Sequence, residues 1–373
     1  MNSEAALHHP SAAAAGQTRT NESTPGFWRR WYAYLVCGVT LFLILLGGLV
    51  TSHDAGLAVP DWPNTFGYNM FLFPPSMWVG GIFWEHTHRL VASLVGVLTI
   101  GLAAWLWWSD SRRWVRVLSY TAVAAVTLQG VLGGITVLFL LPTPISVSHA
   151  VLGQSFFLMT LMLAYSQSPE WHGRAKQDVA AQRPPVSVAR WSLAMLALVF
   201  AQLIAGAAMR HTGSGLAMPD FPTMGGQWIP LFNDAMLNWI NHWRMEYSFS
   251  TGAHLPDVTM GQVVLHFAHR VGALAVTVAA IGAVVALRRS GAYPAGLRTA
   301  WIVLGLVALQ WVFGVWTIWS VRDPLITSFH VVIGAATLGA SMLLCLRVLP
   351  VRWRSTVEVL KANDGESHAP QRV

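Results

Sequence analysis

Four histidines occur in two pairs with the same spacing, inside stretches that are otherwise apolar. The interval in sequence from His88 to His149 equals the interval from His269 to His330, in the second half of the chain. A histidine inside a membrane span costs free energy unless it has a partner. The presence of this costly residue type in both copies therefore favours a shared role over four unrelated core positions.

Haem ligation is the chemistry that such pairs favour. Two imidazoles that face each other in a four-helix bundle suit the axial positions of a haem iron. Zinc needs three or four protein ligands at one site, and each half of the chain offers one clear pair. The spacing predicts two haem sites, with His88 and His149 as iron ligands in one and His269 and His330 in the other.

Arginines directly follow the first histidine of each pair. Arg89 and Arg270 stand where a haem propionate would need a cationic partner. Arginines that extend to the membrane interface explain the same positions equally well. Both interpretations stay open at this point.

Among Glu85, the paired histidines and the arginines that follow them, only Glu85 differs between the halves. Its counterpart in the second half is His266. Glu85 lies three residues before His88, on the same helix face. A carboxylate there suits general acid–base work on a bound substrate, while the alternative is a charge favoured by a helix N-terminus. The difference between the halves favours the first interpretation, with chemistry in the half that contains Glu85.

Two longer segments show that the chain is duplicated. GLAVPDWP at 56–63 returns as GLAMPDFP at 215–222, and LQGVLGGITVL at 128–138 returns as LQWVFGVWTIW at 309–319. The segment at 128–138 recurs after a longer interval than the segment at 56–63 does. The second half therefore carries an insertion after Pro222. Four spans in each half restore the starting orientation, which predicts parallel rather than inverted repeats.

The composition predicts a polytopic membrane protein. Only 10% of the 373 residues are charged, against about 25% in soluble domains, and the mean hydropathy is +0.49. We expect an all-α membrane protein whose eight transmembrane helices form two parallel four-helix bundles related by a pseudo-twofold axis. Eight stretches approach the roughly 20 residues that cross a bilayer: 31–51, 85–108, 117–141, 145–166, 190–210, 263–287, 297–320 and 326–346.

Basic residues are distributed unevenly between the two sides of these spans. Of the 23 Lys and Arg residues, 18 lie in the two tails and the connections on one side. This asymmetry follows the positive-inside rule, which places both termini in the cytoplasm and the histidine pairs near the outer face. The net charge of +7 is thus a topology signal, and membrane lipid rather than nucleic acid is the expected surrounding.

The predicted organisation follows from the spans and the repeat. It consists of a disordered cytoplasmic tail, an N-terminal four-helix half, a cytoplasmic linker, a C-terminal four-helix half and a second cytoplasmic tail. Their residues are 1–30, 31–166, 167–189, 190–346 and 347–373.

Several outer-side and mid-span residues allow two interpretations each. The repeated Asp61 and Asp220 suit a tight turn or a substrate contact, and Gln129 and Gln310 suit interhelical hydrogen bonds or porphyrin contacts. Residues 234–247 are apolar at helical spacing, which predicts an interfacial helix over the second haem site. Glycines in the spans allow close helix packing or room for a macrocycle: Gly130, Gly133, Gly134, Gly153, Gly314 and Gly334.

The chain resembles the heme A synthase family over nearly all of residues 30–348. EHTHR at 85–89 fits the Glu-x-x-His-Arg signature of that family. SHAVLG at 148–153, FHVVIG at 329–334 and the outer-loop segment GLAVPDWP resemble its paired helices and its first loop. Some branches of the family carry a cysteine pair in that loop, whereas residues 52–84 contain no cysteine.

The resemblance implies an oxygen-requiring membrane oxidoreductase that converts haem O into haem A by oxidising a ring methyl to a formyl group through an alcohol. It implies a haem b cofactor on His269 and His330, and the substrate haem between His88 and His149 with Glu85 as the catalytic group. It also implies a bacterial plasma (inner) membrane, an electron donor, and heme O synthase and cytochrome oxidase assembly as partners.

Two other functions fit the histidine pairs. A di-haem b electron-transfer protein needs only paired axial histidines, and a haem transporter or chaperone would use the outer clefts. Glu85 favours an enzyme over the electron carrier, because electron transfer does not need a carboxylate in one half only.

Overall fold

The computed structural model describes residues 26–176, 184–252 and 254–349, and within these ranges it is helical with no strand. Eight helices are long and apolar enough to cross a membrane, so the predicted class of an all-α integral membrane protein is confirmed. They are α1 (Phe27–Ser52), α2 (Gly80–Ser109), α3 (Arg113–Leu138), α4 (Thr143–Ser166), α6 (Val186–His211), α8 (Met260–Ser290), α9 (Pro294–Trp319) and α10 (Pro324–Val348).

Shorter elements connect these spans. α5 (Pro169–Lys176) lies within the predicted linker, and α7 (Asp234–Thr251) lies within the inserted outer segment. Short 3₁₀ turns occur at η1 (Met70–Leu72), η2 (Pro75–Met77) and η4 (Ser214–Leu216). They lie in the loops predicted to face outward, for which the name outer loops is kept. The predicted disorder of residues 1–30 is wrong for 27–30, which form the first turn of α1, and residues 1–25 lie outside the described ranges. Most of the predicted C-terminal tail, residues 350–373, also lies outside them.

Local sequence explains where several helices begin. Thr259 and Gln262 form a capping box at the start of α8, and the Asp323 side chain accepts hydrogen bonds from the first main-chain amides of α10. Proline occupies the first position of α9 and α10. An N–H group at this position would have no acceptor within the helix, so its absence in proline costs no hydrogen bond.

The end of the third span differs from the prediction. The apolar stretch runs to residue 141, but α3 ends at Leu138 because Leu140 and Leu141 both turn to φ 59°. Val321 and Arg322 turn in the same way after α9, with φ values of 52° and 66°. Hydropathy does not reveal this boundary, since apolar residues continue through the turn.

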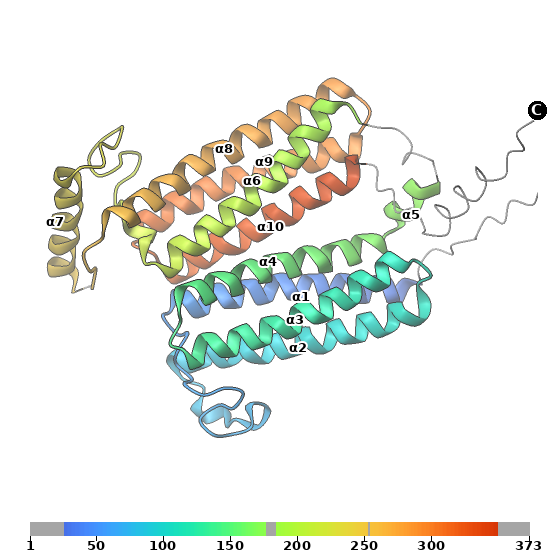
Figure 1. Cartoon of the computed structure of the whole chain (residues 1–373), viewed down its shortest axis with the longest axis horizontal. Helices are drawn as coiled ribbons and strands as arrows, with labels where there is room; N and C mark the ends of the chain where they lie inside the picture. Colours follow the sequence, from blue (N-terminus) through green and yellow to red (C-terminus); the bar gives the residue numbers. More distant parts are fainter. Residues whose placement is uncertain (1–25, 177–183, 253, 350–373) are drawn as a thin grey trace, which may run out of the picture.

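Two four-helix groups lie side by side (Figure 1), one formed by α1–α4 and the other by α6, α8, α9 and α10. Contacts between the groups join α1 to α10 and α4 to α6, with a smaller contact between α4 and α10. Because α1 and α6 are first spans and α4 and α10 are fourth spans, these contacts are reciprocal. The arrangement is consistent with the predicted pseudo-twofold axis.

The long connections after the first span of each half lie at the same end of the molecule (Figure 1). They comprise residues 53–79 in the N-terminal half and 212–259, with α7, in the C-terminal half. Each helix group has its own apolar core, which includes Leu102 and Leu106 in the first and Met195 and Leu338 in the second. The four repeated histidines lie between these cores and the loop end.

Candidate functional site

Each repeated histidine packs against a glycine on a neighbouring helix of its own half. A Cβ atom added to that glycine would lie only 3.2–3.4 Å from the Cε1 atom of the ring. The side chains therefore fill space that any larger residue would occupy. The four pairs are Gly47 with His88, Gly133 with His149, Gly206 with His269 and Gly314 with His330.

The histidines lie at similar depths in their helices. His149 and His330 each follow the first residue of α4 and α10 by six positions, whereas His88 follows Gly80 by eight and His269 follows Met260 by nine. At about 1.5 Å per residue, all four lie roughly 9–14 Å from the loop-side ends of their helices.

Each half contributes two of these histidines, one on its second span and one on its fourth. No group of three or more His, Cys, Asp or Glu side chains comes together as a metal site within the described ranges. Each half therefore presents a two-histidine arrangement.

The ring nitrogens have few partners in the protein. The Nδ1 atoms of His88, His149 and His330 are buried and lack a hydrogen bond within the described residues; the Gln129 main chain approaches the His149 ring without a bond of normal geometry. Such groups are rare in folded proteins. The side chains of all four histidines, although enclosed by protein, keep partial exposure.

The Nε2 atoms of the four rings show the same availability. Within the described residues these atoms form no hydrogen bond, and none of them is fully buried. They therefore border space that protein atoms do not fill. Paired nitrogens with free acceptor positions fit the axial ligation of a haem iron, so the residues present fit that group.

Two glutamines bind the main chain next to the histidines of the C-terminal half. Gln202 on α6 donates to the His269 carbonyl (2.8 Å) and contacts the His269 ring at Nδ1 (3.1 Å). Gln310 on α9 donates to the His330 carbonyl (2.8 Å), as expected for an interhelical hydrogen bond. Sequence reasoning missed Gln202, although it precedes Gly206 by four residues and so shares its helix face.

Glu85 anchors the first outer loop. Its Oε2 atom accepts a hydrogen bond from the Val59 amide (2.8 Å), and its Oε1 atom pairs with Arg89 Nη2 (2.5 Å). The side chain is buried, with 3% relative exposure. In the other half, His266 Nδ1 accepts the equivalent hydrogen bond from the Met218 amide (3.2 Å), since Val59 and Met218 occupy the same place in the repeated outer-loop segments.

Arg89 and Arg270 hold the outer loops through main-chain carbonyls. Arg89 donates to three of them at 2.7–3.0 Å and Arg270 donates to three at 2.7–3.1 Å. Arg89 also donates to Glu85. Arg270 Nε lies 3.3 Å from His266 Nε2, which carries the ring proton and cannot accept while Nδ1 accepts the Met218 amide. The carbonyls are equivalent in the repeat: Val59, Asp61 and Asn64 in the first loop, and Met218, Asp220 and Thr223 in the second. A contact between these arginines and a haem propionate stays a prediction. The propionate would have to share the guanidinium N–H donors with the loop carbonyls.

The repeated aspartates form turns. Asp61 accepts hydrogen bonds from the amides of Phe66 and Gly67, both at 2.8 Å, and Asp220 accepts the equivalent pair at 2.8 and 2.9 Å. Burial acts to raise the pKa of the Asp61 carboxyl, but these hydrogen bonds and the nearby Arg89 hold that pKa below its ordinary value. The turn interpretation therefore accounts for both residues.

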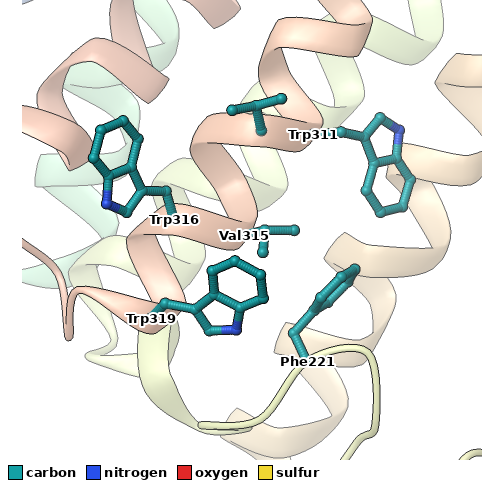
Figure 2. Close-up of a pocket in the computed structure, with 6 residues that line it drawn as sticks. Phe221, Trp311, Val315, Trp316 and Trp319 are labelled. Atoms are coloured by element: carbon teal, nitrogen blue, oxygen red, sulfur yellow. The ribbon is translucent and has the colours of Figure 1, made fainter.

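The outer ends of α3 and α9 differ between the halves. In the first half the Trp62 ring lies against Gly134, where an added Cβ would come within 2.4–2.7 Å of it. In the second half Val315 stands in place of that glycine and Phe221 in place of Trp62. An open groove of about 590 Å³ remains (Figure 2), lined by Phe221, Trp311, Val312, Val315, Trp316 and Trp319.

The predicted helix in the inserted segment is confirmed as α7. Its buried side chains Met236 and Ile240 pack against Met218 in the second outer loop and Val263 at the start of α8. Arg244 donates to the carbonyls of two residues flanking this contact, Leu216 (2.7 Å) and Pro256 (2.8 Å). α7 therefore covers the second outer loop, while its position at a membrane interface stays a prediction.

Several proteins named Heme A synthase are similar in sequence to this chain. A protein named Heme A synthase from Halalkalibacterium halodurans is 27% identical over 300 residues, which cover 79% of this chain and 88% of that protein. One of the same name from Sphingopyxis alaskensis is 25% identical over 369 residues, covering 90% and 94%. Another from Shouchella clausii is 31% identical over 207 residues, covering 52% and 64%.

A family model described as cytochrome oxidase assembly protein, COX15-CtaA, matches residues 76–342. This segment is more than half of the chain and contains Glu85 and all four repeated histidines. The resemblance to heme A synthases is thereby confirmed, and the chain belongs to the COX15-CtaA family of cytochrome oxidase assembly proteins.

Proposed function

We propose that the protein is a heme A synthase, an oxygen-requiring oxidoreductase that converts haem O into haem A through an alcohol. Family membership and the printed names of its relatives support haem A formation. The observation that carries the enzymatic proposal is the exchange of Glu85 for His266 at one structural position.

The exchange matters because loop anchoring alone does not need a carboxylate. His266 accepts the Met218 amide just as Glu85 accepts the Val59 amide, so an imidazole satisfies the loop. A carboxylate adds an acid–base group that an anchoring role leaves unused. We assign this function to Glu85, which can hold a proton at Oε1 when Arg89 Nη2 releases that atom.

The two histidine pairs divide the work between the halves. His88 and His149 hold the iron of the substrate haem O, close to the helix face that carries Glu85. His269 and His330 would hold haem b, which when bound would supply one-electron transfer. Gln202 and Gln310 bind the main chain at these two ligands, which positions α8 and α10 for ligation.

The cellular setting follows from the same assignment. The protein lies in the bacterial plasma membrane with both termini in the cytoplasm and both haem sites toward the outer face. This orientation rests on the basic residues of the tails and connections. Heme O synthase would supply the substrate, an electron donor would be the redox partner, and the product would enter cytochrome oxidase assembly.

Haem analysis tests this function. The full-length protein is produced in cells that supply haem O, with and without oxygen, and the extracted haems are separated by chromatography. Haem A or its alcohol precursor, formed only with oxygen, is expected. Haem b alone in both halves would instead establish a di-haem electron carrier, and unmodified haem O released to an acceptor would establish a transporter.

A further inference from the structure

Arg210 lies at the outer end of α6, in the contact between the two halves. Its Nη2 atom donates to the Gly48 carbonyl (2.7 Å) and to Ser52 Oγ (2.5 Å), both on α1 of the other half. The Ser52 hydroxyl also contacts Ser328 Oγ on α10 (3.0 Å). The guanidinium is thus held where α1, α6 and α10 meet.

Part of this guanidinium remains free. Its Nε and Nη1 groups form no hydrogen bond with the described residues, and both keep some exposed surface. Arg210 forms no ion pair within the described ranges. Three N–H donors therefore face space that a ligand can enter.

The other outer arginines with defined contacts are used differently. Arg89, Arg270 and Arg244 each direct their guanidinium at two or more loop carbonyls. Arg210 directs one nitrogen at the neighbouring half and leaves the rest unpaired. Its counterpart is Thr51, which precedes the first outer-loop segment by the same interval as Arg210 precedes the second. This cation therefore belongs to the C-terminal half alone.

The hydrogen bonds of this cation lead to the helix that carries His330. Ser52, which accepts from Arg210, contacts Ser328 on α10, two residues before His330. A guanidinium enclosed between helices is costly without a bonded anion, and the nearby Asp54 carboxylate forms no ion pair with Arg210 within the described residues. Planar, paired N–H groups favour a carboxylate or phosphate as that anion.

We propose that Arg210 binds a carboxylate of the group held by His269 and His330, which is a propionate of haem b under the proposed function. The same guanidinium ties that group to α1 and hence to the half that binds the substrate. This adds a binding residue that the Glu-x-x-His-Arg pattern does not predict. It rests on the presence of haem b in the C-terminal half.

A fixed positive charge beside the haem favours the reduced iron, because reduction adds a negative charge. Loss of this charge should shift the one-electron reduction equilibrium of haem b toward the oxidised form by about tenfold, which corresponds to 59 mV. Arg210→Gln should also retain less haem b through purification than the unmodified protein does.

The test is a redox titration of the full-length protein, followed by haem absorbance. Three variants are compared: Arg210→Gln removes the charge, Arg210→Lys retains it, and Arg322→Gln is the matched control. Arg322 lies at the same outer end and is an electrostatic neighbour of Arg210, but its side chain is exposed. We expect Arg210→Gln alone to lower the potential, with Arg210→Lys close to the unmodified protein.

Other results would overturn the assignment. If Arg322→Gln shifts the potential as much as Arg210→Gln, the effect reflects net charge rather than a bound propionate. If Arg210→Lys shifts it as much as Arg210→Gln, the contact to α1 and not the charge is responsible. An unmodified protein that contains no haem b would refute the proposed function itself. If Arg210→Gln does not fold, Arg210→Met removes the charge in its place, and an unchanged potential in the charge-removing variant would overturn the assignment.

Discussion

Glu85 and His266 occupy one structural position in the two halves, and each accepts a hydrogen bond from the main chain of its outer loop. The donors are the amides of Val59 and Met218. In both halves an arginine follows four residues later. Arg89 Nη2 lies 2.5 Å from Glu85 Oε1, and Arg270 Nε lies 3.3 Å from His266 Nε2. The halves therefore share a loop anchor and differ in the chemistry of the anchoring group.

This difference predicts that Glu85→Gln separates anchoring from catalysis. Glutamine retains an acceptor for the Val59 amide but cannot carry a proton, so haem A formation should fall roughly 10²-fold or more. The haem b spectrum should stay unchanged, with haem O or the alcohol accumulating in extracted haems. His266→Gln, which alters the same anchor in the other half, is the control and should change turnover only a few-fold. Normal haem A output from Glu85→Gln would remove Glu85 from the mechanism.

Two glycines on α9 predict a local effect on the haem b site. A Cβ at Gly314 would lie 3.3 Å from His330 Cε1, whereas Gly305 on the same helix has no atom within 4 Å. We expect Gly314→Ala to displace the ring and alter the haem b absorbance, and Gly305→Ala to leave it unchanged. Identical spectra for the two variants would show that His330 does not depend on this packing.

Arg89→Lys is expected to loosen the first outer loop. Lysine concentrates its donors at one point and cannot reach the three carbonyls that the planar guanidinium contacts. Hydrogen exchange in residues 56–67 should become faster by a factor of about 10, which corresponds to a loss of about 1.4 kcal/mol in local stability. Residues 215–226, held by Arg270, are the internal control.

The same measurement separates the two roles considered for these arginines. A residue that acts only through a haem propionate would not affect loop exchange in protein freed of haem. Unchanged exchange in haem-free Arg89→Lys would therefore contradict the loop role.

Asp61 predicts a pH-dependent contribution to stability. Its folded-state pKa is held below the ordinary value of 3.8, so its stabilisation is present above that value and is lost as the pH falls through the folded pKa. Asp61→Asn should therefore melt at a lower temperature than the unmodified protein at pH 7. The difference should shrink below pH 3.8, and a difference that stays constant with pH would contradict the assignment of the charge.

The sequence alone is sufficient for the spans, the duplication and the candidate histidines. Long apolar stretches are local features, and all eight predicted spans correspond to helices in the structure. The internal repeat pairs His88 with His269 and His149 with His330, and each of these packs on a glycine of a neighbouring helix. Boundaries are less accurate: α2 begins at Gly80 rather than at residue 85, and the end of α3 falls where apolar residues enter a turn.

The tertiary structure decided what the polar residues near the histidines bind. Glu85 and Arg89 bond to loop groups 25–30 residues away, and Arg210 bonds to α1 across a separation of 158 and 162 residues. Such partners depend on the rotation of each helix and on the path of each loop. Hydropathy and repeat spacing carry neither quantity, so only the packed chain shows which donors are used and which remain free.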